Sequence, residues 1–393
     1  MKRTTIFFLC TISILGTFTA CTKETTPAKQ TEANNIITIT KQEFAPDKRV
    51  ALLNVTFKND SLVGETNLPV ALDSLENRLT AKNIAYTKAV TILPDTSVAN
   101  KTQGVITLST ANLRGAPKHS AEMVTQAIMG TAVQIFKKEG GWYLIQTPDH
   151  YFAWVDAPAV QPMTSDEFTN WKNANKVVYT NFTGRIYADK AMTTVVSDIN
   201  EGDIVKALHT DDNVTEVQLP DGRKGFIKNT NIANFKTWAA SRERTPENLI
   251  ATAKSMLGVP YLWGGTSLKG VDCSGFTKTI YYLNGWILPR DASQQIYEGT
   301  IIDSTKTWSN LQVGDLLFFG KPATKDHKER VIHVGMWIGG DEQFIHSSGK
   351  VRISSMNPKD SLYDEYNLNR YLRSVRIIGN QTKNILPVST ITE

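Results

Sequence analysis

From residue 104 to residue 228 the sequence breaks into short apolar runs separated by turn residues, which is the pattern of a β-rich fold. Close-spaced short strands of this kind predict small β-barrels or sandwiches. Two similar strands, Ala153-Trp154-Val155 and Gly225-Phe226-Ile227, end the two halves of the region. We therefore expect two consecutive small β-barrels, over residues 104–160 and 175–235.

The pattern changes again near residue 245. Thr245-Pro246-Glu247 has the N-cap, first-turn proline and acidic residue that begin a helix. A second helix is expected to start after Asp272, with one apolar face. Strand patterns return after Gly314, and Gly339-Gly340-Asp341 supplies a hairpin turn. Helices followed by an antiparallel sheet predict an α+β domain over residues 245–375.

The chain before the barrels is less regular. Leu68, Leu72, Leu75 and Leu79 recur at helical spacing, and Pro69 fits a first turn. The segment 36–103 is therefore expected to be partly helical. The polar segment 21–35 is expected to be a tether.

The first 20 residues have the pattern of a signal peptide. Lys2 and Arg3 precede an apolar stretch from Ile6 to Leu15 that is too short to span a membrane. Phe18-Thr19-Ala20-Cys21 resembles a bacterial lipobox, which implies lipid attachment at Cys21. We expect export to the cell envelope and a lipid anchor on a periplasmic or extracytoplasmic face. The alternative is an ordinary signal peptide with a coincidental cysteine.

Of the three cysteines, Cys10 would be lost with the signal peptide and Cys21 would carry lipid. Cys273 is then a single free thiol in an exported protein, which raises the hypothesis of a reactive cysteine. The 43 basic and 38 acidic residues give a net charge of only +5, without a dense basic run, so nucleic-acid binding has little support. The sequence has no phosphate-loop, dinucleotide or zinc-helix motif. We expect a monomer without cofactor or metal.

Thiol chemistry needs a thiolate, a base for its proton and a group that orients the base. Cys273 lies at the expected start of a helix, where the backbone dipole lowers a thiol pKa and free N–H groups can bind an oxyanion. His333 begins one strand and His346 ends the next. The hairpin between them would make His333 the general base and His346 its orienting partner.

Three motifs resemble those of the NlpC family of cell-wall cysteine endopeptidases, which have a papain-like fold. They are Asp272-Cys273-Ser274-Gly275-Phe276, His333-Val334-Gly335-Met336 and Phe344-Ile345-His346. The resemblance covers residues 245–375 and implies a catalytic triad of Cys273, His333 and His346. It also implies hydrolysis of the bond between γ-D-glutamate and a diamino acid in murein stem peptides.

The two barrel segments resemble bacterial SH3-like domains, the first more closely. Together the domains resemble a subgroup in which the first SH3-like domain closes one end of the cleft and selects a free N-terminal L-alanine. In that subgroup Ser is common where this chain has Ala292, after Asp291. The resemblance implies these substrate-binding residues: Glu122, Tyr151, Trp263, Asp272, Ser274 and Asp291.

Glu122 and Asp291 could pair with an α-ammonium group, and Trp263 and Tyr151 could form the walls of the pocket. Two other functions stay open. The enzyme could act on intact cross-linked peptidoglycan or as an amidase. Alternatively, the chain could be a non-catalytic wall-binding lipoprotein. The expected partners are murein peptides or peptidoglycan fragments.

Overall fold

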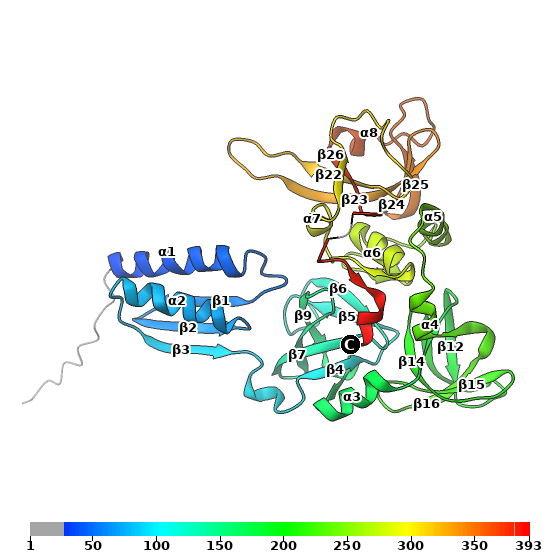
Figure 1. Ribbon diagram of the computed structural model, residues 1–393, viewed down its shortest axis with the longest axis horizontal. Coiled ribbons are helices and arrows are strands. Elements are labelled where there is room, and N and C mark those ends of the chain that lie inside the picture. The colour runs from blue at the N-terminus through cyan, green and yellow to red at the C-terminus, as the bar shows by residue number, and fades with distance from the viewer. Residues whose placement is uncertain (1–26, 381) are drawn as a thin grey trace, which may run out of the picture.

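The computed structural model describes residues 27–380 and 382–393. The predicted signal peptide, Cys21 and the first part of the predicted tether lie outside these residues. An N-terminal α/β unit, two β-rich units and a C-terminal α+β unit follow one another along the chain (Figure 1). The predicted fold class is confirmed.

The N-terminal unit combines two helices with a three-stranded sheet in which β1 and β2 are antiparallel and β2 and β3 parallel. Its elements are α1 (Pro27–Phe44), β1 (Leu53–Lys58), β2 (Ser61–Thr66), α2 (Pro69–Ala81) and β3 (Thr87–Ile92). The helix expected from the leucine spacing is α2, with its proline in the first turn.

Helix α1 differs from the sequence prediction because it begins inside the segment 21–35 that was expected to be a tether. Ala33, Ile36 and Ile37 are buried in one core with the alternate residues of β1 and the leucines of α2. Packing against α2 and β1 stabilises α1, and the helix has little amphipathic pattern of its own. The polar composition of this segment therefore did not indicate a helix.

The first β-rich unit is a seven-stranded sheet in the order β10-β4-β7-β8-β9-β5-β6. Its 3-10 turn η1 (Thr96–Val98) precedes the sheet and η2 (Ala157–Ala159) precedes the last strand. The strands are β4 (Gln103–Ile106), β5 (Thr110–Arg114), β6 (Met123–Ile128), β7 (Ala132–Glu139), β8 (Trp142–Gln146), β9 (Phe152–Asp156) and β10 (Val160–Met163).

The second β-rich unit follows helix α3 (Ser165–Asn173) and repeats the strand order of the first, β17-β11-β14-β15-β16-β12-β13. The matching order supports the interpretation of the two segments as repeats. The elements are β11 (Lys176–Tyr179), β12 (Thr183–Tyr187), β13 (Val195–Asn200), β14 (Ile204–Thr210), β15 (Val214–Gln218), β16 (Lys224–Lys228), η3 (Asn229–Asn231) and β17 (Ile232–Asn234).

The C-terminal unit packs helix α6 against a six-stranded sheet in the order β21-β26-β22-β23-β24-β25. Its helices are α4 (Phe235–Ala240), α5 (Pro246–Ser255), α6 (Cys273–Leu283), α7 (Ala292–Gln295), α8 (Glu365–Asn369) and η4 (Val388–Thr392). Its strands are β18 (Thr266–Ser267), β19 (Gly270–Val271), β20 (Trp286–Ile287), β21 (Thr300–Asp303), β22 (Leu316–Lys321), β23 (Arg330–Gly339), β24 (Gln343–Ser348), β25 (Lys350–Ser355), β26 (Tyr371–Arg376) and β27 (Leu386–Pro387).

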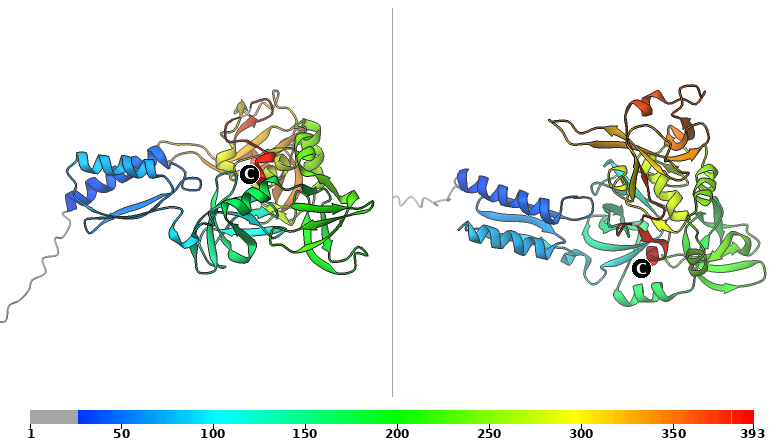
Figure 2. Two further views of the ribbon diagram at one scale, coloured as in Figure 1. Left: turned by 60° about the horizontal axis from the view of Figure 1, so that its bottom comes forward. Right: turned by 45° about the horizontal axis from the view of Figure 1, so that its top comes forward.

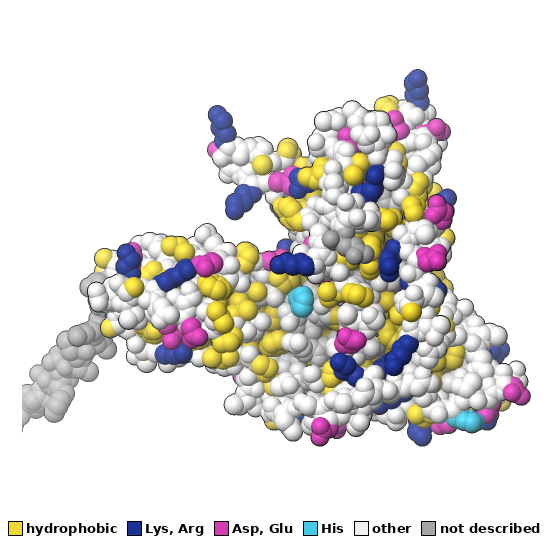
Figure 3. All heavy atoms as spheres, in the orientation of Figure 1, with side chains coloured by type: hydrophobic (Ala, Val, Ile, Leu, Met, Phe, Trp, Pro, Cys, Tyr) yellow, Lys and Arg dark blue, Asp and Glu magenta, His cyan; other side chains and the backbone are white. Residues whose placement is uncertain are grey.

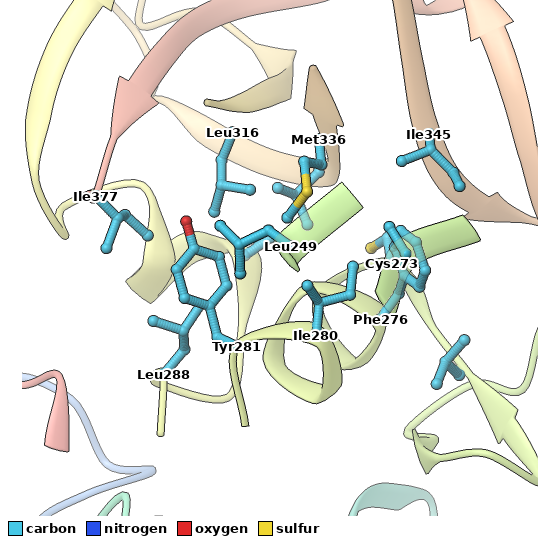
Figure 4. Close-up of a cluster of buried hydrophobic side chains, with 14 of the residues drawn as sticks. Leu249, Cys273, Phe276, Ile280, Tyr281, Leu288, Leu316, Met336, Ile345 and Ile377 are labelled. Carbon is cyan, nitrogen blue, oxygen red and sulfur yellow. The ribbon is translucent and has the colours of Figure 1, made fainter. Parts of the chain in front are cut away.

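The core of this unit lies between α6 and the sheet. Phe276 and Ile280 of α6 meet Met336 of β23 and Ile345 of β24, and Cys273 lies at one end of the same cluster (Figure 4). Alternate residues of a strand point to opposite faces. Trp337 of β23 and Phe344 of β24 therefore face away from α6 and lie in a second buried cluster.

The N-terminal unit projects to one side, while the two β-rich units lie below the C-terminal unit in the view of Figure 1, and the turned views of Figure 2 show the same projection. The β22–β23 hairpin also projects on that side, and the surface is deeply hollowed between it and the N-terminal unit (Figure 3). None of the helices that the structure describes is both long and apolar enough to cross a membrane.

Candidate active site

Cys273 is the first residue of α6. Asp272 caps this helix through a hydrogen bond that its Oδ1 accepts from the Gly275 N–H at 2.7 Å. Cys273 is buried, with 8% of its surface exposed. The backbone N–H groups of Val334 and Ser274 are directed toward the sulfur. Because Val334 follows His333 in β23, this contact places the sulfur beside the strand that carries the first histidine.

A buried ion pair holds the start of α6 in place. The Arg290 guanidinium, 1% exposed, donates to Asp272 Oδ2 at 2.6 Å and to the Ser274 hydroxyl at 2.9 Å. Asp272 Oδ2 also accepts from the Gly264 N–H at 3.0 Å. Asp272 and Ser274 thus face Arg290, and their first role is to fix the residues on either side of Cys273.

His333 and His346 are hydrogen-bonded to each other, with His333 Nε2 at 2.8 Å from His346 Nδ1. His346 Nε2 lies 3.0 Å from the Ser354 hydroxyl and 4.0 Å from Asp364 Oδ2. A proton on His346 Nε2 is favoured by these two oxygens. Nδ1 of His346 then accepts from His333 Nε2–H, which leaves His333 Nδ1 as the basic nitrogen.

Burial sets the protonation of all three groups. Desolvation raises the pKa of the Cys273 thiol to about 12, with a further increase from Asp272, although the surrounding N–H groups and Arg290 oppose it. Desolvation also holds the pKa of His333 well below 6.5 and lowers that of His346 to about 4. The expected lowering of the thiol pKa by the helix dipole is therefore outweighed, and the thiol and both imidazoles are neutral in the resting state.

Cys273 lines a pocket of about 330 Å³. Three units of the chain form its walls. The N-terminal unit contributes Arg49, the first β-rich unit contributes Glu122, Val124 and Tyr151, and the C-terminal unit contributes Tyr261, Trp263, Gly264, Asp272, Cys273, Ser274, Arg290, Asp291, Ala292, Ser293, Val331 and Ile332. All six residues expected to bind substrate thus line this pocket. The two histidines lie outside its lining.

The polar side chains of the pocket contact one another across the domain boundary. Glu122 Oε1 accepts from the Trp263 indole N–H at 2.9 Å, and the Trp263 side chain is otherwise 61% exposed. The Tyr151 hydroxyl lies 3.3 Å from Asp291 Oδ2, and burial together with Asp291 raises the pKa of this tyrosine. A wall of carboxylates and aromatic rings therefore faces Cys273.

Several side chains that contact the predicted site residues were not themselves predicted from the sequence. Arg290 directly precedes Asp291 in the sequence. Its role in holding Asp272 is visible only from its burial in the structure. Ser354 and Asp364 reach His346 from β25 and from the loop before α8. Arg49 lies in the charged run Asp47-Lys48-Arg49, which has the composition of a solvated loop. No local signal in the sequence distinguishes these residues from surface or structural ones.

Comparison with known proteins matches two segments to family models. Residues 258–373 match the NlpC/P60 family, and residues 113–160 match the bacterial dipeptidyl-peptidase Sh3 domain. The chain is 31% identical over 262 residues to a gamma-D-glutamyl-L-lysine dipeptidyl-peptidase of Bacillus cereus, covering 64% of this chain and 76% of that protein. It is 30% identical over 264 residues to dipeptidyl-peptidase 6 of Lysinibacillus sphaericus, covering 64% of this chain and 91% of that protein.

Among solved structures, an NlpC/P60 family protein from Bacillus cereus superposes with a TM-score of 0.58 at 26% identity. The match covers 70% of this chain and 99% of that one. The similarity thus extends well beyond the segment matched by the peptidase family model.

Proposed function

Because the chain belongs to the NlpC/P60 family of peptidoglycan hydrolases, we propose that it is a cysteine endopeptidase that hydrolyses the γ-D-glutamyl-L-diamino acid bond of murein stem peptides. The observation that carries the proposal is the thiol at the start of α6, beside the strand of a buried His333–His346 pair and on the wall of a pocket. The name of the Bacillus cereus relative, a gamma-D-glutamyl-L-lysine dipeptidyl-peptidase, supports the choice of bond.

The protonation states favour general-base catalysis. His333 Nδ1 takes the proton of Cys273 as the sulfur attacks the γ-carbonyl carbon, and the carbonyl oxygen becomes an oxyanion. Backbone N–H groups at the start of α6 stabilise this charge. The protonated His333 then gives its proton to the leaving amine of the diamino acid as the C–N bond breaks.

The remaining thioester is hydrolysed by water. His333 accepts a proton from the water as its oxygen bonds to the acyl carbon, and the sulfur leaves with that proton. His346 keeps the His333 ring oriented throughout, because its Nδ1 holds the opposite ring nitrogen at 2.8 Å. The products are a peptide that ends in γ-D-glutamate and a free diamino acid end.

We place the amino end of the stem peptide in the pocket between the first β-rich unit and the C-terminal unit. Glu122 and Asp291 are the carboxylates available to an α-ammonium group there, and Trp263 and Tyr151 form the adjacent walls. Export and lipid attachment at Cys21 stay predictions from residues 1–21. The relatives include one probable peptidoglycan endopeptidase, from Bacillus subtilis.

The mechanism predicts that Cys273→Ala and His333→Ala each reduce hydrolysis of L-Ala-γ-D-Glu-L-Lys by roughly 10⁴-fold or more, since either change removes a partner of the thiol–imidazole pair. Release of L-Ala-D-Glu would be followed by mass spectrometry on the purified full chain.

His327 provides the matched control, because it lies in the exposed loop between β22 and β23. His327→Ala should cleave at the parent rate. Wild-type hydrolysis by Cys273→Ala would exclude the proposed nucleophile.

A further inference from the structure

The pocket contains a cation that belongs to the protein itself. Arg49 lies between α1 and β1, far from the C-terminal unit in sequence, and its Nη1 donates to Asp291 Oδ2 at 2.7 Å. The same nitrogen donates to the Ser293 hydroxyl at 2.9 Å. The N-terminal unit therefore contacts one of the two carboxylates assigned to the substrate amine.

The segment that carries Arg49 is anchored on both sides of the pocket. Asp47 binds the Arg49 guanidinium through both carboxylate oxygens at 2.7 Å, and Gln294 donates to the same carboxylate at 2.9 Å. The Arg49 carbonyl accepts from the Phe152 N–H at 2.7 Å. Nearby, Leu52 is buried against Phe152 and its neighbours. These contacts hold the segment 47–52 in place, so Arg49 is part of a fixed wall of the pocket.

Arg49 changes the charge that an incoming amine meets. Asp291 lies between two guanidinium groups, with Arg49 at 2.7 Å and Arg290 at 3.9 Å. Glu122 is bonded to the neutral Trp263 indole instead. Among the described residues lining the pocket, Glu122 is thus the carboxylate whose charge is least compensated.

We propose that Arg49 is a specificity-determining residue that competes with the substrate's α-ammonium group for Asp291. By holding Asp291, it lowers the preference of the pocket for a free amino end over an acylated one. Charges a few ångströms apart in a half-buried pocket interact more strongly than in water, so the choice of partner at Asp291 affects affinity. The inference rests on the proposed function in one respect, that this pocket receives the amino end of the peptide.

Binding of two ligands tests the inference without requiring turnover. The dipeptide L-Ala-γ-D-Glu and its N-acetyl derivative would be titrated calorimetrically into the full chain carrying Cys273→Ala. The measured quantity is the ratio of the two dissociation constants. In Arg49→Met, which keeps most of the aliphatic stem, this ratio should move about tenfold further in favour of the free amine, equivalent to about 1.4 kcal/mol.

Lys48→Ala is the matched control, because it removes a cation from the adjacent, exposed position. It should leave the ratio within about twofold of the parent value. The Arg49 effect should also disappear when Asp291→Asn is already present, since the carboxylate that the two cations share is gone. Thermal unfolding of each variant confirms that it is folded.

An unchanged ratio in Arg49→Met, an equal change in Lys48→Ala, or no binding of either ligand to any variant would overturn the inference. Failure of the proposed function gives a different result. In that case the Cys273-containing protein would not cleave the tripeptide, although the ratio of dissociation constants would still depend on Arg49.

Discussion

His346 has a neutral ring because the ring is completely buried and hydrogen-bonded on both sides. The Asp364 carboxylate at 4.0 Å favours the protonated form, but burial outweighs it and lowers the pKa to about 4. The geometry thus keeps the His333–His346 pair neutral at the pH where a general base is needed. It also makes stability depend on pH.

Between pH 6.5 and pH 4, His346 binds a proton in the unfolded state but stays neutral in the folded state. The free energy of unfolding should therefore fall as the pH falls, by about 3 kcal/mol from this residue alone. His346→Gln removes this contribution, so the stability gap between it and the wild type should narrow from pH 7 to pH 4. Urea unfolding across this range measures the gap.

His209 offers a control, since its side chain is 72% exposed beside Asp211. His209→Gln should keep the wild-type dependence on pH. A stability gap for His346→Gln that stays constant from pH 7 to pH 4 would contradict the neutral buried pair.

At the scale of single elements, the start of α6 depends on close contact between two glycines. A Cβ on Gly275 would lie 1.9 Å from the Gly265 carbonyl oxygen, so this helical position accepts no side chain. The contact holds the first turn of α6 against the loop that contains Trp263. Cys273 is two residues away, so its position depends on the same contact.

Alanine normally stabilises a helix interior relative to glycine. Gly275→Ala should do the opposite and lower the free energy of unfolding by about 1–3 kcal/mol, because the backbone must move. A shift of about 1 Å in Cys273 should also reduce kcat/KM by roughly 10²-fold. Urea unfolding and tripeptide hydrolysis measure the two effects.

Gly141→Ala is the comparison, since no atom lies within 4 Å of a Cβ built there. It should change neither property appreciably. Wild-type stability and activity in Gly275→Ala would show that α6 tolerates the shift.

Elements with local signals could be predicted from the sequence. Asp272 and Thr245 cap α6 and α5 as expected, and Gly339 ends β23 before the hairpin. Long-range contacts gave no such signal. Helix α1 depends on packing against α2, and Arg49 meets Asp291 across 242 positions of sequence. Part of the candidate pocket could thus be predicted from motifs, but the wall that Arg49 contributes from the N-terminal unit could not.

At the scale of the whole molecule, Lys–Asp pairs join both β-rich units to the C-terminal unit. Lys278 of α6 pairs with Asp149 of the first unit, and their side chains are 15% and 6% exposed. Lys269 pairs with Asp198 of the second unit, with 42% and 35% exposure. The same chemistry therefore occurs at two interfaces that differ in burial.

Asp149→Asn would remove the carboxylate from the buried Lys278 ammonium, which keeps its hydrogen bond to the Leu288 carbonyl at 3.0 Å. Breaking a buried pair from one side costs about 3–5 kcal/mol, whereas an exposed pair contributes less than about 1 kcal/mol. Asp149→Asn should therefore lower the midpoint of thermal unfolding by roughly 10 °C, and Asp198→Asn by about 3 °C or less. Calorimetry on the full chain compares the midpoints of thermal unfolding of the two variants. Equal shifts would mean that the buried Lys278–Asp149 pair does not stabilise the interface beside the pocket more than the exposed pair does.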